Sequence, residues 1–443
     1  MSSLRFLTFL IFAYTTVEGL VINMLYPNTL PFIFKDGAIV LAYLALLTET
    51  RGSNGSLSKI SGPLIAFGLV TCAFLLLPAP GMSLLGELVA VKQRLFYIPL
   101  IWVGYHFLRD ERDLRALLRV MAWTAIPACI FGIYLYFTGP SGLTAIGANY
   151  SAVINSTAGE HNISFWRVPG TFNSPGQYGG YLLVNAVLFV GVLFDAGVDS
   201  RQRLLTTVSL VIALGALLVS GSRSPLLLFM LCCVLMLMLT GRLKGIGVWA
   251  GGLYGVLTVG FTFFGEGVHD RVGSIASWEH VSRFQETYFG QLFWPMLLQA
   301  PMGFGLGRAT IGARHFTEWR NVMLVESYFG IIVAETGVIG LAIFLWAMLA
   351  VVALLWRCHA VMRSAPTRTL WYAVALPVLV TACLMPISTG VDAAPGNMYF
   401  YFFLGAAIRL YDVERARREG RLIPTDASQP AADYPAGSPV SYQ

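Results

Sequence analysis

The chain has 443 residues, a formal net charge of +6, and a composition that is 56% hydrophobic and only 12% charged. Its mean hydropathy is +0.68. Soluble globular proteins carry about 25% charged residues, so this composition excludes a soluble fold for most of the chain. Because backbone polar groups in lipid must be satisfied within helices or closed barrels, and the apolar runs here are long and continuous, we predict an all-α, polytopic integral membrane protein.

Apolar windows of roughly 17–25 residues mark membrane-spanning helices. In chain order they predict about twelve transmembrane helices, of which the tenth is long enough to be one tilted helix or a broken pair. The predicted spans are residues 4–22, 30–48, 61–79, 93–108, 115–138, 176–194, 204–220, 225–240, 246–264, 322–356, 370–386 and 397–411.

Residues 1–411 are predicted to form a single transmembrane domain. Two longer polar stretches interrupt it, at 139–175 and 265–321, and the second would be a long periplasmic loop between the ninth and tenth spans. Residues 412–443 are rich in Pro, Ala, Ser and charge, which predicts a disordered cytoplasmic tail.

The distribution of lysine and arginine predicts the orientation, because these residues favour short cytoplasmic loops. With both termini in the cytoplasm, every inside connection carries at least one of them. Lys35 lies within a span and can pair with the adjacent Asp36. The basic residues that then fall on the outer side are Lys92, Arg94, Arg167, Arg223, Arg271, Arg283, Arg308, Arg314 and Arg320.

Arg223 occupies a tight bend between two spans, in the stretch VSGSRSPLLLF at 219–229. Desolvating a charge near the membrane costs a few kcal/mol, and an anion at the outer leaflet would offset that cost. A guanidinium matches phosphate oxygens bidentately, so Arg223 is a candidate for a phosphate-binding cluster. The alternative is that it extends to lipid headgroups. Arg271, Arg308, Arg314 and Arg320 are expected to be solvated loop charges.

Two further segments carry candidate site residues. In RFQETYFGQLFWPMLLQAPMGFGLG at 283–307, apolar residues at helical spacing predict a stretch that lies flat on the outer surface. In NVMLVESYFGIIVAETGVIG at 321–340, Glu326 opens an apolar helix, on one stripe with Gly330 and Gly337. A carboxylate at a membrane boundary is a functional candidate, or else a favourable charge at a helix N-terminus. Glu335 lies deeper and fits a buried polar network.

Four stretches, in this order and spacing, resemble the O-antigen ligase and polysaccharide polymerase superfamily. They are RVPGTFNSPGQYGGYL at 167–182, GSRSPLLLF at 221–229, the segment at 283–307, and ESYF…ETGVIGL at 326–341. The resemblance covers residues 165–356. It implies that outer-face arginines hold the undecaprenyl pyrophosphate of a lipid-linked glycan, which is then transferred to an acceptor hydroxyl.

On this resemblance Arg223 and Arg283 match the arginines that would hold the pyrophosphate, and we expect Arg167 and Arg94 to add supplementary contacts. The ligases have a histidine where this sequence has Glu326, and this difference favours a polymerase of exopolysaccharide or O-antigen repeat units. Glu326 is then the predicted general base that activates the acceptor hydroxyl.

The resemblance implies a multi-pass protein of the bacterial inner membrane whose active site faces the periplasm. Expected partners are the undecaprenyl-pyrophosphate-linked oligosaccharide, an acceptor glycan, the lipid bilayer and other polysaccharide-export proteins, but no nucleic acid. No DxD-like pair falls on the outer side and the histidines are scattered, which predicts a metal-independent glycosyltransferase without a cofactor. Three alternatives stay open: a ligase that transfers glycan to lipid A core, a transporter or flippase, and a non-catalytic partner in a polysaccharide assembly.

Overall fold

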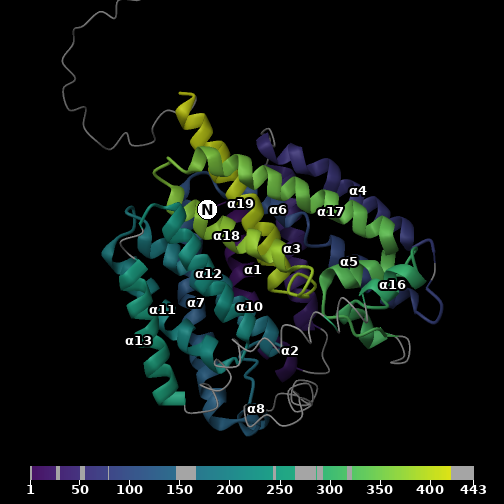
Figure 1. Ribbon diagram of the computed structural model, residues 1–443, viewed down its shortest axis with the longest axis horizontal. Coiled ribbons are helices and arrows are strands. Elements are labelled where there is room, and N and C mark those ends of the chain that lie inside the picture. Colours follow the sequence, from purple (N-terminus) through teal and green to yellow (C-terminus); the bar gives the residue numbers. More distant parts are fainter. Residues whose placement is uncertain are drawn as a thin grey trace, which may run out of the picture.

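The computed structural model describes residues 2–25, 30–49, 55–77, 79–145, 166–242, 246–264, 293–316 and 322–420, together with residue 286. Throughout these residues the secondary structure is helical, without strands (Figure 1). The helices are α1 Ser3–Thr15, α2 Glu18–Met24, α3 Leu30–Glu49, η1 Gly55–Leu57, α4 Ser58–Phe74, α5 Leu84–Leu95, α6 Leu100–Phe107, α7 Glu111–Thr138, α8 Pro140–Ala145, α10 Pro175–Phe194, α11 Ser200–Val219, α12 Arg223–Leu239, α13 Ile246–Phe264, α16 Trp294–Gln299, η5 Ile311–Phe316, α17 Tyr328–Met362, α18 Arg368–Leu384 and α19 Gly396–Arg418.

Several of these helices are suited to cross a membrane. Within the described residues, five are long and apolar enough, and a sixth is added if the bent pair α1–α2 counts as one span. Each of the twelve ranges predicted from the sequence overlaps a helix. The all-helical class and its membrane character therefore agree with the prediction, whereas the count of twelve stays a prediction.

α10 lies at the centre of the bundle, and 78% of its most apolar 18-residue stretch is buried. It packs against α7, α11, α12, α18 and α19. α6 and α19 approach each other closely because Gly104 faces the backbone of Phe402 and Gly405 faces the backbone of Ile101. Small residues permit such close contact between membrane helices. The core of the protein is thus built from helices that come from distant parts of the chain.

Two breaks interrupt apolar segments that the sequence presents as continuous. The first separates α1 from α2, which are bent by 61°. Backbone groups around this break form hydrogen bonds with the irregular segment before α10: Leu20 N donates to Thr171 O at 2.9 Å, and Thr171 Oγ1 donates to Thr16 O at 2.5 Å. Non-helical backbone is tolerated in a membrane protein where it is buried in protein and satisfied in this way.

The second break lies inside α17 at Gly337, whose backbone has φ 62° and ψ −155°. Of the two forms predicted for the tenth span, the structure has the broken pair. A side chain is disfavoured at this positive φ, and an added Cβ would also meet the carbonyl oxygen of Pro301. α17 begins at Tyr328, later than the predicted residue 322, because Ser327 caps it by accepting from Gly330 N.

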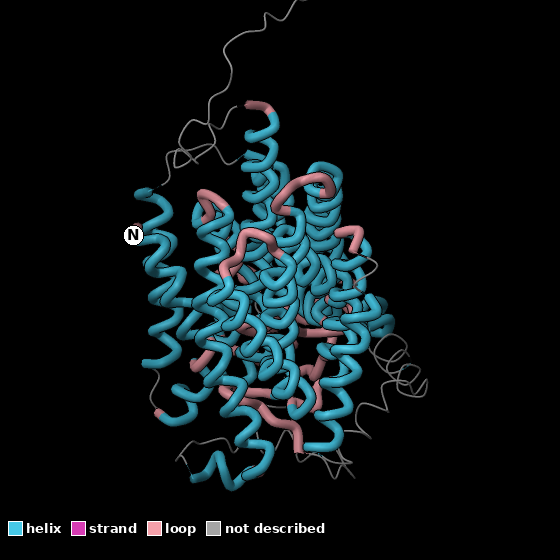
Figure 2. Tube along the Cα trace, turned by 90° about the vertical axis from the view of Figure 1, so that its left-hand side faces the viewer, coloured by secondary structure: helices cyan, strands magenta, loops and turns pink. Residues whose placement is uncertain are grey.

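The two ends of the bundle differ in character. At one end, which we call the arginine-rich end, Arg5 pairs with Asp113, Arg115 pairs with Asp195, and Arg417 reaches Glu111. This end contains the start of α1 and the end of α19, so both ends of the described chain lie together. Figure 2 shows connecting loops at the two ends of the helical bundle.

The opposite end, which we call the loop end, contains the starts of α10, α12, α17 and α19 and the segments before them. Hydrogen bonds from backbone and side-chain groups join these segments to one another. Ser222 Oγ donates to Pro175 O at 3.0 Å, and Tyr328 N donates to Met385 O at 3.0 Å. α10 and α12 then run to the arginine-rich end, where Arg242 lies over the ring of Phe194.

Two predicted boundaries need correction. The final helix continues to Arg418, so residues 412–418 are helical, not part of the predicted disordered tail; residues 421–443 lie outside the described residues. The predicted outer loop 139–175 contains the short helix α8 and, from residue 166, an irregular segment of which residues 168–172 are buried. Of the predicted loop 265–321, the structure describes residues 293–316 and residue 286.

Candidate functional site

Arg223 lies at the loop end as the first residue of α12. The bend before it is fixed on α10, because Ser222 donates to the carbonyl of Pro175 and packs against Gly179. The side chain of Arg223 is half-buried. A cation in the first turn opposes the positive end of the helix macrodipole, at a cost of about 0.3–1 kcal/mol. An anion bound here would remove that cost.

Arg167 lies at the same end, in the irregular segment that leads into α10, and is also half-buried. This segment is held in place by Thr171, as described above, and by Asn23, whose Nδ2 donates to Asn173 Oδ1 at 2.7 Å. α10 itself starts with Ser174, whose hydroxyl accepts from Gln177 N. Arg167 and Arg223 therefore both belong to segments packed at the N-terminal end of α10.

Glu326 is also at the loop end, with an exposed side chain. It precedes α17 in an extended stretch, so the predicted stripe with Gly330 and Gly337 does not form. The reason is local: Ser327 takes the capping position, and Gly337 departs from helical geometry. The stretch is anchored by Tyr328 N, which donates to Met385 O and to Ser388 O. Glu326 is therefore presented outside the helix.

The structure places Arg94 away from any surface. Its side chain and that of Glu335 have 0% exposure and form an ion pair between α5 and α17. Arg94, predicted as a supplementary pyrophosphate contact, instead neutralises a buried carboxylate, and its place at the site needs correction. The prediction that Glu335 belongs to a buried polar network is confirmed.

Glu335 also holds the glycine-rich loop that precedes η5. Its Oε1 accepts from Ala309 N at 2.8 Å and from Thr310 N at 2.7 Å. On either side of the break in α17, Phe304 N donates to Ala334 O and Val338 N donates to Pro301 O. The backbone groups that the break leaves without helical partners are thus satisfied by the loop. Residues 301–310 form a docked element of the bundle.

The other outer arginines are placed differently. Arg308 lies on the docked loop and donates to Pro80 O, so it is not simply solvated. Arg283, the second predicted pyrophosphate ligand, lies outside the described residues, as do Arg271 and Arg320 and the side chain of Arg314.

Two ion pairs near α3 were not anticipated. Lys35 pairs with Glu18 of α2 at 2.7 Å, and both side chains are almost fully buried. The neighbouring Asp36 pairs instead with Lys92 of α5. The pairing suggested for Lys35 and Asp36 is wrong because consecutive residues of a helix point in different directions. Two lysines and two carboxylates therefore join α2, α3 and α5.

No group of three or more His, Cys, Asp and Glu side chains is placed to hold a metal ion within the described residues. Comparison with models of known protein families gave no match, and a search of curated proteins also gave none.

Proposed function

We propose that the protein is a membrane glycosyltransferase that polymerises undecaprenyl-pyrophosphate-linked oligosaccharide repeat units at the outer face of the inner membrane. In this proposal the twelve predicted spans place the loop end in the periplasm. The observation that carries the proposal is the presence of Arg167, Arg223 and Glu326 at one end of the bundle, opposite the arginine-rich end where both described chain ends lie.

The electrostatics of the loop end support an anionic donor. α10 and α12 both begin there, and helix N-termini favour negative charge. Two guanidinium groups, from Arg167 and Arg223, lie in segments packed against the start of α10. Arginine binds phosphate oxygens through paired hydrogen bonds. Arg283 is the further ligand that the sequence resemblance supplies.

The proposed reaction joins an acceptor hydroxyl to the anomeric carbon of the donor sugar. The hydroxyl oxygen forms the new glycosidic bond, its proton passes to the Glu326 carboxylate, and the bond to the pyrophosphate breaks. The electron pair of that bond leaves with undecaprenyl pyrophosphate, where the arginines stabilise the added charge. Glu326 is accessible to an acceptor because it is exposed and lies outside the helix.

Purified protein in proteoliposomes tests the proposal with lipid-linked repeat units as the only substrate. The expected product is a ladder of longer lipid-linked chains, read by gel electrophoresis and mass spectrometry. Transfer only after lipid A core is added would identify a ligase, and movement of substrate between leaflets without new glycosidic bonds would identify a flippase. If a folded preparation forms none of these products, the remaining alternative is a non-catalytic partner in a polysaccharide assembly.

A further inference from the structure

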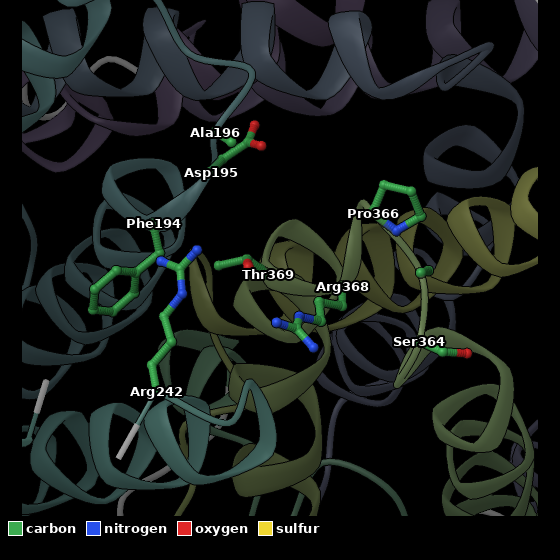
Figure 3. A pocket seen from close by; sticks show the side chains of 9 residues that line it. Phe194, Asp195, Ala196, Arg242, Ser364, Pro366, Arg368 and Thr369 are labelled. Atoms are coloured by element: carbon green, nitrogen blue, oxygen red, sulfur yellow. The ribbon is translucent and has the colours of Figure 1, made fainter. Parts of the chain in front are cut away.

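A polar cavity of about 300 Å³ lies at the arginine-rich end, away from the residues assigned to glycosyl transfer. It is bounded by the end of α10, the end of α12 and the connection between α17 and α18. Its charged and polar lining comprises Asp195, Arg242, Ser364, Arg368 and Thr369. Figure 3 shows Arg242 and Arg368 extending into this space from different elements. We call it the Arg242–Arg368 cavity.

Among the described residues, the only carboxylate in the lining of the cavity, Asp195, already forms an ion pair with an arginine outside the lining. Asp195 Oδ2 accepts from Arg115 Nε at 2.6 Å, and Asp195 Oδ1 accepts from Gly197 N at 3.2 Å. Asp195 therefore compensates Arg115, and among the residues that the structure describes the charges of Arg242 and Arg368 remain in excess. In the part of the chain that the structure describes, neither of these two arginines forms an ion pair.

Both arginines are held where an anion would be favourable. Arg242 lies over the ring of Phe194, with 5.2 Å between the guanidinium carbon and the ring centroid. This contact orients the guanidinium while leaving its N–H groups available. Arg368 is the first residue of α18, and its N-cap Thr367 makes no side-chain capping bond. A cation at this position opposes the macrodipole, as Arg223 does at the loop end.

We propose that the Arg242–Arg368 cavity binds a phosphate-bearing anion, whose expected source is the headgroup of an anionic phospholipid in the adjacent leaflet. Two guanidiniums and the Thr369 hydroxyl offer donors for phosphate oxygens. Its volume is at the lower limit of small-molecule sites, which suits a headgroup and not a whole oligosaccharide. Basic pockets between membrane helices are typical sites for such headgroups. The inference is independent of the proposed glycosyl transfer.

The test uses full-length protein in two arms. In the first, protein from nanodiscs of phosphatidylglycerol or phosphatidylcholine is released and the retained lipid is measured by native mass spectrometry. In the second, thermal unfolding in detergent is compared in sodium phosphate and in sodium chloride of equal ionic strength. Selective retention of phosphatidylglycerol identifies the headgroup as the source, whereas stabilisation by phosphate alone identifies a soluble phosphate.

The double variant Arg242→Gln/Arg368→Gln should lower binding at least about tenfold in whichever arm is positive, since each charge-assisted hydrogen bond contributes on this scale. Arg363→Gln is the matched control, because Arg363 is exposed in the same connection and does not line the cavity. Arg368→Lys keeps the charge and should retain part of the binding. The proposal is overturned if neither arm is positive, or if Arg363→Gln lowers binding as much as the double variant.

Discussion

The guanidinium of Arg94 and the carboxylate of Glu335 form an ion pair that is fully buried, although the two residues are 241 positions apart in the chain. The same carboxylate accepts two backbone N–H groups from the loop 301–310. One side chain thus joins α5, the first part of α17 and the docked loop. The local fold around the break in α17 depends on this contact.

Removing one partner of this pair is expected to be more damaging than removing both charges. Arg94→Met leaves a buried carboxylate without its cation, which costs about 3–5 kcal/mol. Arg94→Met/Glu335→Gln removes the charges, while the Gln carbonyl can still accept from Ala309 N and Thr310 N. Thermal unfolding of the purified proteins should therefore rank the double variant above Arg94→Met. The opposite ranking would contradict the role assigned to the pair.

Gly337→Ala should destabilise the protein strongly. The alanine would have to adopt φ 62° and ψ −155°, a region essentially restricted to glycine, at a cost of about 1–3 kcal/mol, and its Cβ would overlap the carbonyl of Pro301. Gly252→Ala in α13 is the control, since a Cβ added there would meet no described atom within 4 Å. The control should be neutral or slightly stabilising. Both variants are compared by protein yield after extraction and by unfolding temperature. Equal values for the two would refute the conclusion that the break in α17 requires glycine at position 337.

Arg223→Ala should reduce the rate of polymer formation roughly 10–100-fold, because it removes charge-assisted contacts to the pyrophosphate. Arg223→Lys should retain part of the activity as a point charge. Arg203→Ala is the matched control, as Arg203 is exposed at the opposite end of the bundle, near the start of α11. Polymer length in cells with equal protein levels is the measurement. The hypothesis fails if Arg223→Ala and Arg283→Lys both make normal amounts of long polymer.

Glu326→Gln should lower the rate by about 10²–10⁴-fold while leaving folding intact, since the side chain is exposed and an amide has nearly the same shape. The unfolding temperature serves as the folding control. Substrate binding, measured with a lipid-linked donor, should remain close to wild type because the arginines are unchanged. A fully active Glu326→Gln protein would exclude this residue as the general base.

The predicted sidedness can be measured by cysteine labelling. In a background that lacks the exposed Cys72 and Cys383, Ser224→Cys at the loop end should react with a membrane-impermeant maleimide added outside. Ser200→Cys at the arginine-rich end should react only after the inner membrane is permeabilised. Reversed accessibility would place Arg223 in the cytoplasm and remove the basis of the proposed function.

The sequence was most informative where apolar residues are continuous. The spans predicted at 176–194 and 246–264 correspond to Pro175–Phe194 and Ile246–Phe264. Such runs need only local composition to be recognised. The sequence does not predict the helix Leu84–Leu95, because Glu87, Lys92 and Arg94 interrupt its apolar residues and no continuous apolar stretch remains. Its charged residues contact partners from elsewhere in the chain.

Long-range contacts explain what local patterns missed at the candidate site. Arg94 was grouped with the outer arginines by its place in the chain, but its partner Glu335 lies in another helix. The place of Arg223 at the tip of a bend was foreseen, because GSRSP separates two apolar runs. That Ser222 would fix this bend on Pro175 depends on the packing of α10 against α12, which no local pattern contains.

The contacts around the break between α1 and α2 constrain the order in which the protein is assembled. Leu20 N and Thr16 O find their partners on Thr171, about 150 residues downstream of Leu20. During synthesis from the N-terminus, α1 and α2 are therefore made about 150 residues before the segment that forms hydrogen bonds with the break between them. The hydrogen bonds that satisfy this break can therefore form only after Thr171 has been synthesised, so the final geometry of the first two helices depends on a later part of the chain.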